Sequence, residues 1–202
     1  AYYDNRILVQ RGNHSGDSQL WSFDANTGEV VWKANYSQQW ERYLAPTINE
    51  NGIYVNGGYY GGLYGFNHDG SQVFFRSLSQ VDQWTPALDE AGNVYTWTGG
   101  VLRQHDQLSG DDQWTLSVQS KTTAIIAGSL LIGHGGGTLY VVDTEQAQIL
   151  WQKSNTFYGV PAVSNGIIYV HGMNGSGEFV VSAYSLNDGT LIREYPMATK
   201  SV

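Results

Sequence analysis

The chain contains no cysteine, which excludes disulfide bonds, zinc–thiolate centres, a cysteine nucleophile and a lipid attached to cysteine within these residues. Charged residues are also scarce, at 14% of the sequence, and the ten lysines and arginines form no basic stripe against a net charge of −8. Nucleic acid is therefore not expected as a partner. No apolar run approaches the roughly 18 residues of a membrane span, so we expect no membrane insertion.

Glycine and aromatic residues are what the sequence has in abundance. Its 25 glycines separate short runs of aromatic and β-branched residues, and aromatics make up 13% of the chain. There is no sustained apolar spacing at i, i+3, i+4 and i+7, the pattern of an amphipathic helix. Glycine-rich turns between short apolar runs predict an all-β protein.

A repeat of about 40 residues organises these runs. Its clearest copy spans 22–32 and is typical of a strand, a tight turn and a second strand. The Asp of that turn, or its counterpart, recurs at Asp24, Asn67, Asp106, Asp143 and Ser185. This period predicts a single β-propeller domain built from four-stranded antiparallel blades. The expected blades span about residues 1–43, 44–83, 84–121, 122–158 and 159–195, with 196–202 as a candidate first strand of a sixth blade.

Each repeat carries residues suited to fastening one blade to the next. The Asp can accept hydrogen bonds from the turn, the Gly can adopt positive φ, and a large aromatic follows on the next strand. A flat ring at that position is expected to wedge between blades, where each Å² of buried apolar surface contributes about 25 cal/mol. The predicted blade-docking residues are Asp24, Gly28, Trp32, Phe74, Asp106, Gly110, Trp114, Asp143 and Trp151.

The stretch from Ser22 to Trp32 resembles the tryptophan-docking motif of PQQ-type propeller repeats, Ala-x-Asp-x-x-Thr-Gly-x-x-x-Trp, and only Ser22 departs from it. The resemblance implies one of two kinds of protein. One is a quinoprotein dehydrogenase, whose propeller carries PQQ and usually calcium. The other is a non-catalytic scaffold, such as the propeller lipoprotein of the outer-membrane assembly machinery. Members of the family usually close with seven or eight blades, so five blades predict part of a larger ring, completed by the parent chain or by a partner chain.

No residue of this chain matches the catalytic Asp or the calcium-binding Glu and Asn of the dehydrogenases, and the adjacent Cys pair of many of them is missing. We therefore assign no catalytic, cofactor-binding or metal-binding residue and expect no cofactor, with PQQ and calcium as the alternative. His134 and His171 occupy matching places at the ends of second strands. Two histidines could bind a metal, but a hydrogen-bonding ring is the preferred interpretation because a third ligand is not evident.

One face of the predicted propeller collects the longest loops and many aromatic residues. Loops that join the second and third strands share this face with loops that join successive blades, whereas the Asp-x-x-Thr-Gly turns lie on the opposite face. Recognition surfaces are typically built from aromatic residues on loops. The candidate partner-binding residues are Trp40, Tyr43, Tyr59, Tyr60, Trp84, His134, Phe157, Tyr158 and His171.

These observations predict a non-catalytic binding scaffold that presents its loop face to a protein or a glycan. The alternatives are a fragment of a PQQ-dependent dehydrogenase and a purely structural blade array in a large surface protein. The absence of cysteine fits a periplasmic or extracellular location in bacteria, although many cytosolic proteins share it.

Overall fold

The computed structural model of the chain describes residues 1–12, 18–38, 45–58, 60–79, 84–119 and 123–197. It divides into two compact units, Ala1–Ser117 and Val118–Val202. The first unit contains three four-stranded antiparallel sheets and the second contains two, and the described residues include no helix. The predicted all-β architecture of four-stranded propeller blades is thus confirmed, with five blades formed by the described residues.

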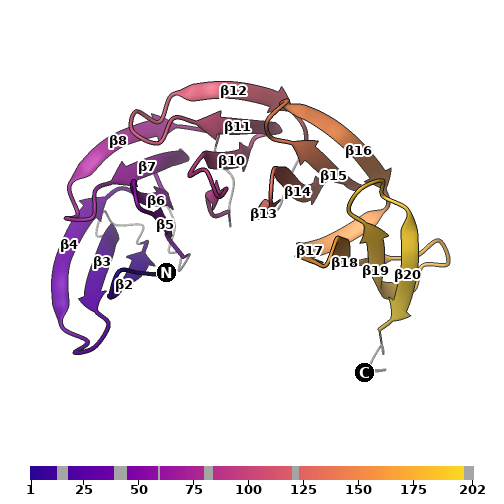
Figure 1. Cartoon of the computed structure of the whole chain (residues 1–202), viewed down its shortest axis with the longest axis horizontal. Coiled ribbons are helices and arrows are strands. Elements are labelled where there is room, and N and C mark those ends of the chain that lie inside the picture. Colours follow the sequence, from indigo (N-terminus) through magenta and orange to yellow (C-terminus); the bar gives the residue numbers. More distant parts are fainter. Residues whose placement is uncertain (13–17, 39–44, 59, 80–83, 120–122, 198–202) are drawn as a thin grey trace. The chain divides into compact units, whose positions relative to one another are not determined.

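Each blade is a meander in which consecutive strands are neighbours, so the fourth strand lies at one edge (Figure 1). Blade 1 contains β1 (Tyr2–Tyr3), β2 (Arg6–Arg11), β3 (Ser18–Asp24) and β4 (Val30–Tyr36). Blade 2 contains β5 (Thr47–Asn49), β6 (Gly52–Asn56), β7 (Gly62–Phe66) and β8 (Gln72–Ser77). Blade 3 contains β9 (Ala87–Leu88), β10 (Val94–Thr98), β11 (Val101–His105) and β12 (Asp112–Ser117).

The second unit repeats this plan with longer strands. Blade 4 contains β13 (Ile125–Ala127), β14 (Leu130–Gly135), β15 (Thr138–Asp143) and β16 (Gln148–Ser154). Blade 5 contains β17 (Thr156–Ser164), β18 (Ile167–Met173), β19 (Phe179–Ser185) and β20 (Leu191–Pro196). Blade 5 therefore begins at residue 156 rather than 159, and Pro196 ends its last strand; residues 198–202, expected in a further strand, lie outside the described residues.

The third and fourth strands of every blade share one irregularity. Their pairing shifts register just before the turn that joins them, for example between Ser22 and Phe23 and between Val141 and Val142. An extra residue at such a point bends the strand and increases its twist. Because the shift recurs at the same place in all five blades, each Asp-containing turn leaves its sheet in the same way.

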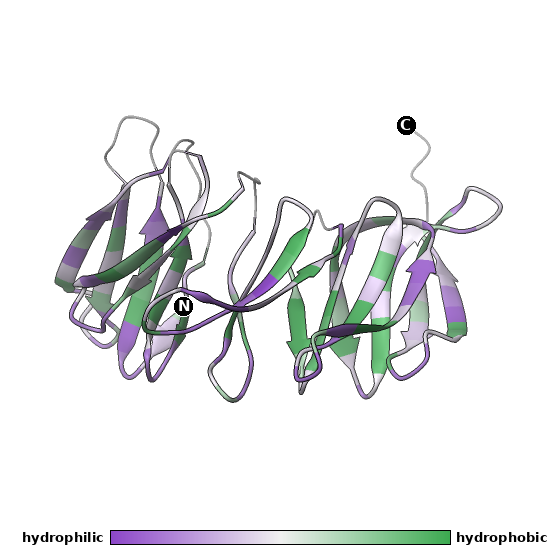
Figure 2. Cartoon of the chain, turned by 90° about the horizontal axis from the view of Figure 1, so that it is seen from above, coloured by the Kyte–Doolittle hydropathy of each residue, from purple (hydrophilic) through white to green (hydrophobic). Residues whose placement is uncertain are grey.

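The core consists of apolar clusters between neighbouring blades. Between blades 1 and 2, Leu8 and Leu20 pack with Ile53 and Val55. Alternate side chains of a strand point to opposite faces, so the intervening residue Tyr54 faces blade 3 instead, where it packs with Trp84 and Val94. Blades 4 and 5 are joined in the same way. In Figure 2 the hydrophobic residues follow the strands, whereas the turns are mainly white or purple.

The described residues form no helix that is long and apolar enough to cross a membrane.

Candidate functional site

The carboxylate of Asp24 is engaged by its own turn. Its Oδ1 accepts hydrogen bonds from the backbone N–H groups of Asn26 and Thr27, at 2.9 and 3.0 Å. These bonds, with that from Thr27 the larger influence, hold the pKa of Asp24 below its usual value. Gly28 completes the turn with a φ of 72°. A carboxylate committed to turn N–H groups has a structural role, and this turn offers no catalytic acid or base.

Asp106 and Asp143 cap the equivalent turns in blades 3 and 4. Asp106 Oδ1 accepts hydrogen bonds from the N–H groups of Leu108 and Ser109, which lower its pKa. Asp143 Oδ1 accepts from the two residues at the same positions of its own turn. Gly110 has a φ of 74°, and in blade 4 the same left-handed conformation is taken by Ala147, with a φ of 52°.

Aromatic rings from two of the predicted docking positions, Trp32 and Trp151, lie at blade junctions. The indole Nε1 of Trp32 donates to His68 O of the next blade at 2.9 Å, and that of Trp151 donates to Leu186 O at 2.8 Å. A Cβ added at Gly70 would lie 2.8 Å from the Trp32 ring, and one at Gly189 would lie 2.7 Å from the Trp151 ring. The glycine of one blade thus lets the ring of the preceding blade lie flat against its backbone.

The other two aromatic docking residues belong to blades 2 and 3. Phe74 contacts Gly110, where an added Cβ would lie 2.5 Å from the ring. Within its own unit, Trp114 pairs with Gln104 across the sheet, and its ring centroid is 6.0 Å from that of Tyr95.

A second connection between blades is made at the end of the second strand, by what we call the latch residues (Gln10, Asn56 and His134). Gln10 Nε2 donates to Asn56 Oδ1 at 2.9 Å, and Asn56 Nδ2 donates to Trp84 O at 2.8 Å. His134 Nε2 lies 2.6 Å from Gly159 O, which makes this nitrogen the protonated one. Burial lowers the pKa of His134, because the charged imidazolium is poorly solvated there.

Three of the predicted partner-binding residues are buried, and their assignment to an exposed face is corrected here. Trp84, His134 and Phe157 are only 4%, 6% and 8% exposed. Trp84 packs in the cluster between blades 2 and 3, and Phe157 packs in the cluster between blades 4 and 5. Phe157 also lies in strand β17 rather than in a loop. Packing between blades, not partner contact, explains these rings.

The remaining candidates differ in their surroundings. Tyr60 is 78% exposed on the connection between β6 and β7. Tyr158 and His171 lie opposite each other in β17 and β18, with ring centroids 5.5 Å apart. Phe179, which the sequence did not single out, completes a three-ring cluster with them, 6.1 Å from Tyr158 and 5.8 Å from His171. Trp40, Tyr43 and Tyr59 lie outside the described residues.

A buried polar network in blade 3 resembles a catalytic triad in its connectivity. Thr96 Oγ1 lies 2.7 Å from His105 Nε2, and His105 Nδ1 lies 3.2 Å from Asp112 Oδ1. Burial lowers the pKa of His105, although the Asp112 charge acts in the opposite direction. Thr96 and His105 are both 1% exposed, so no substrate reaches this hydroxyl and the network is structural. Among the described residues, no three His, Asp or Glu side chains converge as a metal site would require.

Comparison with known proteins agrees with this architecture. The family model described as outer membrane protein assembly factor BamB matches residues 1–95 and 98–198. The outer membrane protein assembly factor BamB of Yersinia pestis is 22% identical over 204 residues, which cover 85% of this chain and 50% of that protein. The crystal structure of BamB from Moraxella catarrhalis superposes with a TM-score of 0.77 at 16% identity, covering 97% of this chain and 62% of that one. This chain therefore spans about half the length of the curated relative that it matches.

Proposed function

Because the chain belongs to the family of the outer membrane protein assembly factor BamB, we propose that it is a non-catalytic scaffold that binds a protein partner in the periplasm. The family membership supports the scaffold role over that of a PQQ-dependent dehydrogenase. The relatives' names suggest that the partner belongs to the outer-membrane assembly machinery.

The observation that carries the proposal is the placement of Tyr60. Its connection is fastened by backbone hydrogen bonds from Gly57 to Gly62, from Gly58 to Ser37 and from Leu78 to Gly61, at 2.9, 2.6 and 3.2 Å. A highly exposed tyrosine on a connection held in this way loses little conformational entropy on binding, which is the property of an interface anchor. The turns of the opposite face carry no comparable aromatic residue among the described positions.

Site-specific photo-crosslinking in the bacterial cell envelope tests this proposal. A photoreactive phenylalanine derivative at position 60 is expected to capture a component of the outer-membrane assembly machinery, and Tyr60→Ala is expected to weaken co-purification of that component. Leu108, which is 66% exposed on the turn face, is the matched control position. Equal capture from both positions, or capture from position 108 alone, would exclude the loop face as the binding face.

The aromatic cluster of blade 5 supports a second part of the proposal, that a further blade of the same repeat covers this sheet in the complete protein. Tyr158, His171 and Tyr195 lie in one row across the sheet. His171 takes the position that His134 takes in blade 4, but its Nε2 is buried without a hydrogen-bond partner among the described residues. By analogy with His134, the missing acceptor would be a backbone carbonyl at the start of the next blade.

The variant Tyr158→Lys combined with Phe179→Lys distinguishes a covered sheet from an open one. Both rings are 40% exposed in this chain, so the double variant should change its stability by less than about 0.5 kcal/mol. In a complete protein with a blade on this sheet, two buried charges should lower the free energy of unfolding by several kcal/mol. An equally small change in the free energy of unfolding in this chain and in the complete protein would show that no blade covers the cluster.

A further inference from the structure

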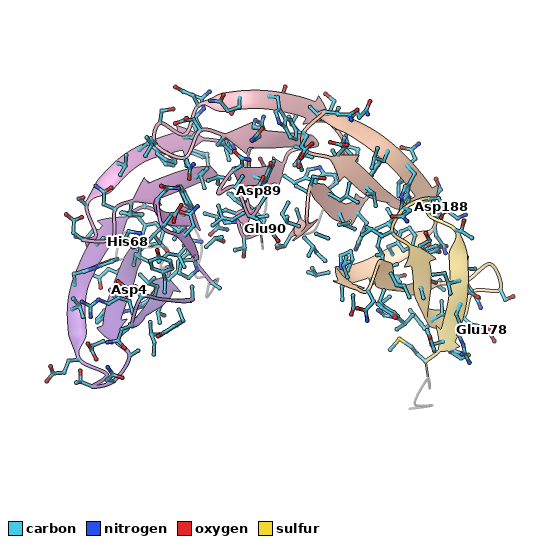
Figure 3. The ribbon with its side chains drawn as sticks, viewed as in Figure 1. Asp4, His68, Asp89, Glu90, Glu178 and Asp188 are labelled. Carbon is cyan, nitrogen blue, oxygen red and sulfur yellow. The ribbon has the colours of Figure 1, made fainter. Side chains whose placement is uncertain are left out.

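A cavity of about 390 Å³ lies at the junction of blades 1 and 2, on the side of the Asp-containing turns. Figure 3 marks two of its lining residues, Asp4 and His68, at turns of these blades. The polar and aromatic residues that define its chemistry are Asp4, Arg6, Ser22, Trp32, Glu50 and His68. Its volume falls in the range of small-molecule pockets, which is about 300–1,000 Å³.

The cavity lies where the first position of one row of blade 1 carries a smaller side chain than the same position of blade 2, whose row is Tyr54, Gly65 and Phe74. Leu8, Ser22 and Trp32 are paired across blade 1. In blade 2 the first of these positions is Tyr54, whose ring is buried and whose hydroxyl donates to Gln107 O at 3.2 Å. A leucine in place of that tyrosine leaves the space beside the junction unfilled.

Blade 4 fills the same row with apolar side chains. Ile132 and Val141 replace the Leu8 and Ser22 of blade 1, and both are fully buried in the cluster with blade 5. Ser22 is also the one departure of this stretch from the docking motif, which has Ala there. The row of blade 1 therefore differs from that of blade 2 by its smaller first side chain and from that of blade 4 by the hydroxyl group of Ser22.

The hydroxyl of Ser22 points to a ligand. Ser22 is 0% exposed, and its Oγ has no hydrogen-bond partner among the described residues. Buried polar atoms are nearly always paired, since an unpaired one loses its hydrogen bonds to water without replacement. A molecule in the cavity that both accepts and donates hydrogen bonds would satisfy this group.

The charges around the cavity oppose an anionic ligand. Arg6 contributes a guanidinium whose Nη1 is 3.3 Å from Asp24 Oδ2, so its charge is already paired within the chain. Asp4 and Glu50 contribute two carboxylates, which oppose a bound anion. Together these groups offer hydrogen-bond donors and acceptors to one molecule, as a polyhydroxylated ligand requires.

Aromatic rings supply an apolar surface beside these polar groups. The Tyr3 and His68 rings are stacked, with centroids 5.1 Å apart and planes inclined by 22°, and His68 Nε2 lies 3.2 Å from Glu50 O. Both rings and the Trp32 indole line the cavity. Flat rings next to mixed donors and acceptors suit a sugar ring, which has apolar C–H faces and a rim of hydroxyl groups.

We propose that this cavity binds a sugar unit, with the Ser22 hydroxyl paired to a sugar hydroxyl and the ring placed beside Trp32. This site lies on the turn face and is separate from the protein-binding function proposed for Tyr60. The junction of blades 1 and 2 would thus bind a ligand in addition to the blade-docking role of the motif, which involves no ligand.

Titration followed by NMR tests the proposal with the whole chain. The ¹H–¹⁵N signal of the Trp32 indole, assigned by its loss in Trp32→Phe, is recorded while glucose or N-acetylglucosamine is added to millimolar concentrations. We expect a saturable shift of this signal. The trisaccharide of N-acetylglucosamine distinguishes two sources of the sugar. If the natural ligand is a glycan strand, the trisaccharide should bind more tightly than the monosaccharide; if it is a free sugar, the two should bind equally well.

Three variants separate binding in the cavity from indirect effects. Ser22→Ala restores the residue of the docking motif and should weaken sugar binding about tenfold. Leu8→Tyr copies blade 2 and should abolish the shift; if this variant does not fold, Ser22→Ala carries the test. Thr98→Val is the matched control, because Thr98 Oγ1 is also buried and unpaired among the described residues but does not line the cavity. It should leave the affinity unchanged.

Three results would contradict the proposal. No saturable shift with any of the sugars would overturn the proposal and leave water as the partner of Ser22. A shift with methylammonium or inorganic phosphate, but not with sugars, would contradict the neutral ligand. An equal loss of affinity in Ser22→Ala and Thr98→Val would contradict binding in this cavity. Loss of crosslinking at position 60 would not affect this test, since the two sites are read out independently.

Discussion

The junction between blades 1 and 2 and the junction between blades 2 and 3 are fastened alike but filled differently. In both, an aromatic ring lies against a glycine of the next blade, Trp32 on Gly70 and Phe74 on Gly110. At the second junction Tyr54 fills the space inside this contact, whereas Leu8 leaves a cavity at the first. Fastening and filling are therefore separate features of a blade, and one can vary while the other is kept.

The largest expected effect comes from emptying the filled junction. Tyr54→Leu removes a buried ring and its hydrogen bond to Gln107, and should lower the free energy of unfolding by about 3 kcal/mol. Tyr60→Leu is the matched control on an exposed side chain and should change it by less than about 0.5 kcal/mol. Urea unfolding measures both. Equal values for the two variants would mean that Tyr54 does not fill the junction.

The contact between ring and glycine can be tested with a pair of glycine substitutions. Gly110→Ala places a Cβ 2.5 Å from the Phe74 ring, whereas the Cβ of Gly28→Ala meets nothing within 4 Å. Both positions have positive φ, so each variant should lose about 1 kcal/mol from backbone strain. The overlap with Phe74 should cost Gly110→Ala about 2 kcal/mol more. Similar urea midpoints for the two variants would argue against close ring packing.

The latch at His134 should make stability depend on pH. Burial lowers the pKa of His134 in the folded state, so below about pH 6.5 the unfolded chain takes up a proton that the folded chain does not. The contribution of neutral His134 to the free energy of unfolding is thus present above this pH and is lost as the pH falls. His134→Asn keeps a donor, as Asn56 does in blade 2, and should reduce this loss between about pH 7 and pH 5. Thermal unfolding at both values measures it; an unchanged loss would exclude His134 as a source.

The smallest effect is expected in the turn of blade 4, where Ala147 holds a φ of 52°. Ala147→Gly relieves this left-handed conformation and should raise the free energy of unfolding by about 0.5–1 kcal/mol. Calorimetry of this variant beside Gly28→Ala, the reverse change in blade 1, provides the comparison. A loss of stability in Ala147→Gly would show that the turn tolerates alanine without strain.

Much of the fold follows from local sequence. The repeat at Asp24 and its counterparts fixes strand, turn and strand, because the Asp and the positive-φ residue determine the turn from within a few positions. The blade count and the four-stranded sheets were predicted on that basis. Residues expected in the loops between blades were harder to place: Phe157 and Tyr158 are adjacent in β17, yet one packs toward blade 4 and the other lies on the opposite side of this strand.

The cavity could not be predicted, because it results from the lack of a side chain large enough to fill the space between two blades. Leu8 alone is an ordinary core residue, and its consequence appears only when its row is compared with that of Tyr54 in three dimensions. Ser22 was visible as the one departure from the docking motif, but a serine in a strand has many roles. That its hydroxyl lies buried and unpaired beside open space is a property of packing between two blades.

The central claim is that, at the two junctions within residues 1–117, the side chain in the row position shared by Leu8 and Tyr54 decides whether the junction is filled or open. The crystal structure of the Leu8→Tyr variant tests it most directly. We predict that the introduced ring occupies the cavity while Trp32 remains against Gly70 and the backbone of both blades is unchanged. An introduced ring that turns to solvent beside a persisting cavity, or blades that move apart to admit it, would contradict the claim.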